Sequence, residues 1–128
     1  MKLRVILAGN AEKHQGSPFR NGLNGVYVKK KSKHVNNYPY WLQSNQVNAI
    51  WWDKESSNWT IGQKVDLGTG VCSIYALIGD ERNPNQIQSG WKYMDKNCKW
   101  QAAGSNEVII QDCSAVIDAR DQSYCTLS

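Results

Sequence analysis

Few residues in this 128-residue chain are of the types that perform acid–base or nucleophilic catalysis. The two histidines, His14 and His34, stand in polar stretches, and neither lies in a motif that sets a nucleophile beside a base. Glycosidase chemistry requires two carboxylates. The nearest pairs are Asp53 with Glu55 and Asp80 with Glu81. Both pairs are interpreted as solvated loop charges, so a small hydrolase ranks third among the functions considered and the chain is not expected to be an enzyme.

Aromatic side chains are the stronger chemical theme. The chain holds six Trp and six Tyr but one Phe, more amphipathic aromatic residues than a core of this size needs. Rings at a protein surface mark recognition sites, and amide side chains beside them can bond the hydroxyls of a sugar. The candidate ligand-binding residues are Tyr38, Tyr40, Trp41, Trp51, Gln43 and Asn48.

Neighbouring residues of a β-strand point to opposite sides of the sheet, so Trp51 and Trp52 are predicted to be divided between an open face and the core. Trp51→Ala should then leave the fold largely intact, whereas Trp52→Ala should cost about 3–5 kcal/mol as a core truncation. The alternative is that both sheet faces are covered and every Trp belongs to the core.

Residues 29–33 read Lys-Lys-Lys-Ser-Lys. In a regular strand Lys29, Lys31 and Lys33 share one face and are the candidate polyanion-binding residues. The alternative is an edge strand protected from aggregation by its lysines.

The four cysteines are Cys72, Cys98, Cys113 and Cys125, and all of them are disulfide candidates. No C-x-x-C motif is present, so neither a metal site nor any other cofactor is expected. Three disulfide connectivities are open, and buried thiols are the alternative. An even number of cysteines favours a secreted or extracellular protein, although the apolar run within residues 1–8 is shorter than a signal peptide requires and is predicted to be a strand.

Short segments rich in Val, Ile, Thr, Tyr and Trp recur about every ten residues and are separated by Gly, Asn, Asp and Ser, which predicts antiparallel strands. The strands are expected at Lys2–Ala8, Gly25–Lys31, Tyr38–Gln43, Ala49–Asp53, Asn58–Gln63, Val71–Ile78, Gly90–Asp95, Cys98–Ala102 and Glu107–Gln111. We predict one all-β domain over 1–128, a sandwich or flattened barrel of about 8–10 short strands. Residues 9–24 are expected to be a loop and residues 114–128 a C-terminal extension, with the best candidate for a helix within 114–123.

Two hairpins have a definite predicted register. In the first, a four-residue loop pairs Asp53 with Asn58 and places Trp52 opposite Trp59. In the second, a two-residue turn at Lys96–Asn97 pairs Tyr93 with Trp100. That register would place Trp100 on the same face as Trp91 and Tyr93.

The net charge of +4 is too modest to indicate a nucleic-acid binder, and no apolar run approaches the length of a membrane span. These observations leave a glycan or a protein as the expected partner.

The succession of Gly25-Val26-Tyr27, Ile50-Trp51-Trp52, Asn58-Trp59-Thr60-Ile61-Gly62 and Trp91-Lys92-Tyr93 resembles the Trp/Tyr-rich β-modules that are repeated in large eukaryotic proteins. The similarity covers residues 25–113. It implies a non-catalytic module, and it implies a disulfide between Cys72 and Cys113. Cys98 and Cys125 fall outside the pattern.

The expected function is therefore a non-enzymatic recognition module that binds carbohydrate through exposed aromatic rings. The alternative is a protein-interaction or structural module without a small-molecule ligand.

Overall fold

The computed structural model describes residues 1–13, 22–77 and 83–114 of the chain. Their strands form one antiparallel sheet in the order β8-β7-β6-β5-β4-β3-β2-β1-β9. The strands are β1 Lys2–Leu7, β2 Gly25–Val35, β3 Tyr38–Gln43, β4 Asn48–Asp53, β5 Asn58–Gln63, β6 Ile74–Ala76, β7 Trp91–Met94, β8 Trp100–Ala102 and β9 Val108–Asp112. The short helices are α1 Gly9–Lys13, η1 Lys64–Asp66 and η2 Pro84–Gln86. The predicted all-β class and flattened-barrel architecture are confirmed.

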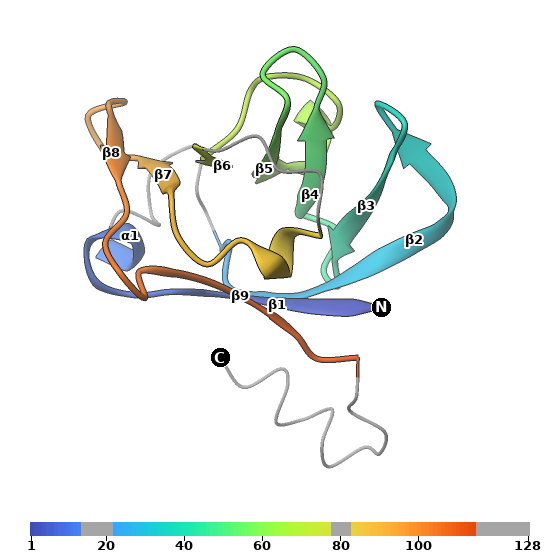
Figure 1. Ribbon diagram of the computed structural model, residues 1–128, viewed down its shortest axis with the longest axis horizontal. Coiled ribbons are helices and arrows are strands. Elements are labelled where there is room, and N and C mark those ends of the chain that lie inside the picture. Colours follow the sequence, from blue (N-terminus) through green and yellow to red (C-terminus); the bar gives the residue numbers. More distant parts are fainter. Residues whose placement is uncertain (14–21, 78–82, 115–128) are drawn as a thin grey trace.

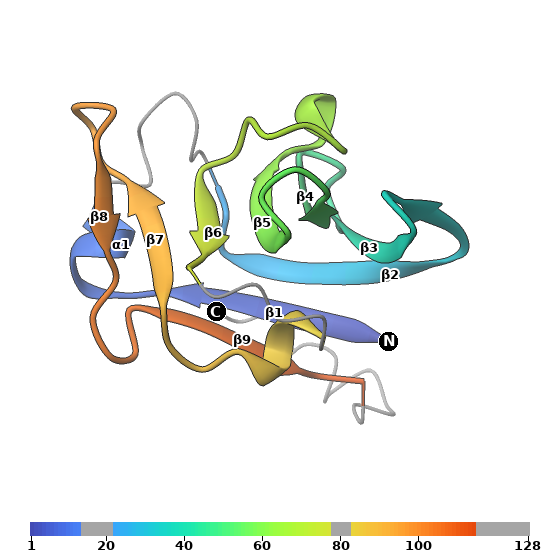
Figure 2. The same cartoon turned by 45° about the horizontal axis from the view of Figure 1, so that its top comes forward.

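The sheet curls strongly (Figures 1 and 2). Strands β8 and β9 stand at its opposite ends, yet only residues 103–107 separate them in the sequence. The twist of antiparallel strands allows this curvature, which curls the sheet around an apolar interior. We call the side that faces this interior the inner face and the opposite side the outer face.

The prediction of a loop over residues 9–24 is wrong for its first five residues, because residues 9–13 form helix α1. The Glu107 side chain supplies a reason: its carboxylate accepts the backbone N–H of Asn10 at 2.7 Å and that of Gly104 at 2.6 Å. The hydrogen bonds from Gly104 and Asn10 hold the pKa of the Glu107 carboxyl below its usual range. Glu107 thus joins the start of α1 to the β8–β9 connection. The rest of the predicted loop up to residue 21, His14 included, and the predicted extension from residue 115 onward lie outside the described residues.

The inner face carries the main core, to which every strand except β8 contributes buried side chains. Its largest members are Trp41, Trp52, Trp59 and Trp91. The outer face carries a second, smaller cluster made by Tyr40, Leu42, Ala49, Trp51 and Cys72. Both faces of the central strands are therefore covered, which explains why all six residues of β4 are buried.

The connection between β5 and β6 covers the outer face at Trp51. The Trp51 indole N–H donates to the carbonyl oxygen of Thr69 at 3.0 Å. Gly62 permits the close approach, because a Cβ atom there would lie 3.0 Å from both the Cα of Cys72 and the Cη2 of Trp51. The wall that hides Trp51 thus comes from a segment distant from it in the sequence.

The predicted register of the β4–β5 hairpin is confirmed. Asp53 pairs with Asn58, Trp51 with Thr60 and Trp52 with Trp59. The rings of Trp52 and Trp59 meet edge to face on the inner side, with their centroids 5.5 Å apart.

The predicted register of the β7–β8 hairpin is wrong by one residue: Tyr93 pairs with Gln101, and Trp100 pairs with Met94. The turn holds one residue more than predicted, because Cys98 adopts a left-handed conformation with φ of 60°. The Asp95 carboxylate stabilises this turn by accepting the N–H groups of Asn97 and Lys99. The shift moves Trp100 from the predicted inner face to the outer face.

No helix in the described part of the chain is long and apolar enough to cross a membrane.

Candidate functional site

Five of the six residues predicted to bind a ligand are buried, and the sixth is half-buried. Tyr40, Trp41, Trp51, Gln43 and Asn48 are buried, and Tyr38 is half-buried with its ring centroid 4.8 Å from that of Trp52. The expectation of an exposed aromatic site at these positions is wrong, since the main core covers one side of the sheet and the second cluster covers the other.

The two predicted amide residues instead attach the chain before β2 to the sheet. The Gln43 side-chain amide donates to the carbonyl oxygens of Gly22 and Asn24, and the Asn48 amide donates to the Gln43 Oε1 at 2.8 Å. These hydrogen bonds hold the segment before β2 against the buried ends of β3 and β4.

The lysine run does not form a regular strand face. Lys29 pairs with Trp41 and His34 with Pro39, so the residues between them in β2 stand opposite Tyr40 alone. This bulge interrupts the alternation on which a shared face for Lys29, Lys31 and Lys33 was predicted. Lys29 is half-buried, with its ammonium 5.9 Å from the centroid of the Trp41 ring, whereas Lys31 and Lys33 are exposed. Strand β2 lies between β1 and β3, so it is not an edge strand of the sheet.

The Cys72–Cys113 bridge implied by the resemblance is not present. Cys72 is a buried thiol of the outer-face cluster, whereas Cys113 belongs to a separate cluster with Val26. Cys98 is an exposed thiol, and Cys125 lies outside the described residues.

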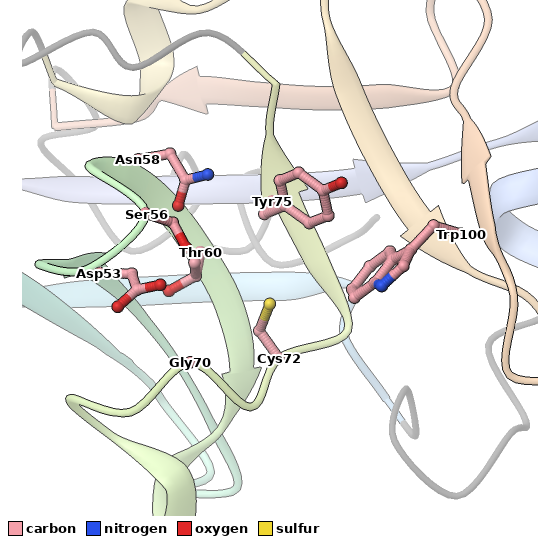
Figure 3. A pocket seen from close by; sticks show the side chains of 8 residues that line it. All are labelled: Asp53, Ser56, Asn58, Thr60, Gly70, Cys72, Tyr75 and Trp100. Atoms are coloured by element: carbon pink, nitrogen blue, oxygen red, sulfur yellow. The ribbon is translucent and has the colours of Figure 1, made fainter.

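The structure brings together a different set of residues on the outer face, around a pocket of about 370 Å³ (Figure 3). We call it the Trp100 pocket. Its lining residues come from the β4–β5 hairpin, the connection before β6, β6 itself and β8: they are Asp53, Ser56, Asn58, Thr60, Gly70, Cys72, Tyr75 and Trp100.

One wall of the Trp100 pocket is aromatic. The rings of Tyr75 and Trp100 meet edge to face with their centroids 4.7 Å apart. Trp100 is 38% exposed, and the other five indoles of the chain, all in described residues, are at most 6% exposed. Trp100 is therefore the indole most available to a ligand.

The facing wall is polar. Asp53 and Asn58 form one cross-strand pair of the β4–β5 hairpin and are only 5% and 7% exposed. The Asp53 Oδ1 accepts the backbone N–H of Glu55 at 3.3 Å. The Asn58 Oδ1 is buried and accepts no hydrogen bond from the described residues. Because a buried acceptor without a partner is costly, this wall is suited to a ligand that donates hydrogen bonds.

Cys72 also lines the pocket and lies between the two walls (Figure 3). Burial first, and the nearby Asp53 carboxylate second, raise the pKa of its thiol to about 12. A thiol of this kind remains protonated at neutral pH and is a weak nucleophile. Of the predicted carboxylate pair, Asp53 lines the pocket and Glu55 is an exposed loop residue.

This environment predicts unequal alkylation of two thiols. With iodoacetamide near pH 8, exposed Cys98 should be labelled and Cys72 should remain almost unlabelled, because its thiolate is scarce and buried. Asp53→Asn removes the second cause of the raised pKa and should therefore speed labelling of Cys72 without changing the rate at Cys98. Peptide mass spectrometry measures both rates, and equal rates at the two cysteines in the wild-type chain would contradict the assignment.

No protein-family model matches the sequence, and no curated protein or solved structure matches it significantly. The resemblance to Trp/Tyr-rich β-modules therefore stays a prediction.

Sequence reasoning missed Trp100 because it assumed a two-residue turn after Asp95. The available signal was Asp95 itself, since an Asp at the start of a turn can accept N–H groups two and four residues later, as this one does. Cys98 occupies the left-handed position that lengthens the turn. Gly or Asn usually occupies such a position, so the sequence did not indicate it.

Proposed function

We propose that this chain is a non-enzymatic recognition module that binds carbohydrate in the Trp100 pocket. The single observation that carries the proposal is the pairing of a half-exposed Trp100–Tyr75 wall with the buried polar pair Asp53 and Asn58 across one concavity. A sugar ring has an apolar C–H face and polar edges, so it needs a flat aromatic surface on one side and hydrogen-bonding groups on the other.

The size of the concavity agrees with this ligand class. Sites for small molecules typically enclose about 300–1,000 Å³. The volume of about 370 Å³ is at the lower end of that range and suits one or two sugar rings.

The chemistry of the lining groups favours binding over turnover. The raised pKa of the Cys72 thiol keeps it protonated. Among the described residues that line the pocket, Asp53 is the only one with a carboxylate. Glycosidase chemistry requires two carboxylates on either side of the scissile bond.

Trp100→Ala is the direct test of the proposal. The substitution should weaken glycan binding at least about tenfold, because the stacking surface is lost. The melting temperature should stay close to that of the wild type, since all three residues of β8 are exposed. A glycan array identifies the sugar, and a titration followed by tryptophan fluorescence measures its affinity.

Two further measurements complete this experiment. Trp100→Phe should retain most of the affinity, and Lys99→Ala, an exposed neighbour outside the pocket lining, should retain all of it. Failure of every glycan to bind, or full affinity in Trp100→Ala, would overturn the proposal.

A further inference from the structure

The polar wall of the Trp100 pocket presents two hydrogen-bond acceptors that the described residues leave open. The Asp53 carboxylate can only accept, and the structure gives its Oδ2 no donor among the described residues. The Asn58 Oδ1 is likewise an acceptor without a partner. The Thr60 hydroxyl, which also lines the pocket, donates to the carbonyl oxygen of Trp51 at 3.0 Å.

The charge of the pocket favours a ligand that carries a positive charge. Of the described residues that line it, Asp53 carries the only formal charge, and the residue is 5% exposed. Burial of a carboxylate without a cation beside it is unfavourable in free energy. A ligand that places a cation beside the carboxylate offsets part of this desolvation penalty. Lys92, the cross-strand neighbour of Tyr75, does not line the pocket.

The aromatic wall also favours a cationic ligand. An ammonium group within about 6 Å of an indole or phenol ring is attracted to the face of the ring. A cationic group in the pocket would lie between the Trp100–Tyr75 wall and the Asp53 carboxylate, and both attract it.

We propose that the Trp100 pocket selects amino sugars, with the sugar's ammonium group bound to Asp53 and Asn58 and its ring on Trp100. This inference rests on the proposed function and narrows its ligand class. The pocket should bind a neutral sugar more weakly, because a hydroxyl donates without bringing a charge. It should bind a sugar acid most weakly, because a second carboxylate would face Asp53.

Glucosamine, glucose and glucuronate, titrated at one ionic strength and near pH 6, are the probes that test the proposal. Wild-type protein should bind glucosamine about tenfold more tightly than glucose, the usual gain of a hydrogen bond to a charged group. Glucuronate should bind more weakly than glucose. Calorimetry or tryptophan fluorescence measures the three affinities.

Two variants test whether the Asp53 carboxylate causes the preference for glucosamine over glucose. Asp53→Asn keeps an oxygen that can accept the Glu55 N–H but loses the charge, so it should lose the preference and bind glucosamine and glucose with equal affinity. Gly70→Ala leaves the carboxylate in place and adds a methyl group beside it, since the new Cβ would lie 3.7 Å from the Asp53 Oδ2. Gly70→Ala should therefore also reduce the preference for glucosamine.

The possible outcomes separate the two proposals. Equal binding of the three sugars by the wild type, or an unchanged preference in Asp53→Asn, would overturn the amino-sugar inference and leave carbohydrate binding standing. If none of the three sugars binds but another glycan does, the amino-sugar inference fails alone. If no glycan binds at all, the proposed function fails and the inference fails with it.

Discussion

Trp51→Ala is expected to destabilise the protein by about 3–5 kcal/mol, as much as Trp52→Ala. The sequence alone predicted a large loss for Trp52 and a small one for Trp51. The structure changes the second expectation, because the Trp51 side chain is 0% exposed and its indole N–H donates to Thr69. Truncating it would leave a cavity beneath the β5–β6 connection and an acceptor without its donor.

Urea unfolding followed by circular dichroism measures the two losses. Val65→Ala is the matched control, because Val65 lies in the same covering segment and is 87% exposed, so its loss should be close to zero. A wild-type-like midpoint for Trp51→Ala would mean that the covering segment does not pack on the outer face as described.

Raising the pH above 9 is expected to destabilise the fold progressively. The Cys72 thiol has a pKa of about 12 in the folded chain and an ordinary value of 9.0 when exposed. Since the folded-state pKa is the higher one, the stabilisation is complete below pH 9 and is lost as the pH rises towards 12. The full loss is on the order of 4 kcal/mol.

The buried phenol of Tyr27 also makes the folded state less stable as the pH rises. Complete burial raises the pKa of its phenol far above the usual 10.0, and its hydroxyl donates to the carbonyl oxygen of Leu23 at 2.7 Å. An ionised Tyr27 would lose this hydrogen bond inside an apolar core, so unfolding is favoured further above pH 10.

Urea midpoints measured between pH 7 and 11 test this expectation. Cys72→Ala should lose less stability than the wild type between pH 9 and 11, because it removes one of the two groups that ionise on unfolding. Tyr27→Phe should reduce the loss that begins above pH 10. An identical pH dependence in the wild type and in both variants would show that neither group is buried as the structure places it.

Much of the fold could be predicted because its determinants are local. The alternation of apolar and polar residues and the turn residues between them predict nine strands, and the described residues form nine. The β4–β5 register follows from the hairpin loop after Asp53, which pairs Trp52 with Trp59 and leaves Trp51 on the other side. These relations need only neighbours in the sequence.

The candidate site could not be predicted in the same way, since it depends on one turn and on contacts between distant segments. The left-handed Cys98 shifts the β7–β8 register by one residue, and a shift of one residue transfers Trp100 to the opposite side of the sheet. Only then does its ring meet Tyr75 on the outer face, across the pocket from Asp53 and Asn58.

The sequence by itself thus determined the strand positions and the side of the sheet on which Trp51 and Trp52 lie, because the pleat acts between adjacent residues. The tertiary structure alone decided which of these faces is open to a ligand. Exposure depends on what packs over a residue: the β5–β6 connection buries Trp51, while Trp100, at the edge of the sheet, stays open to solvent beside a polar pocket.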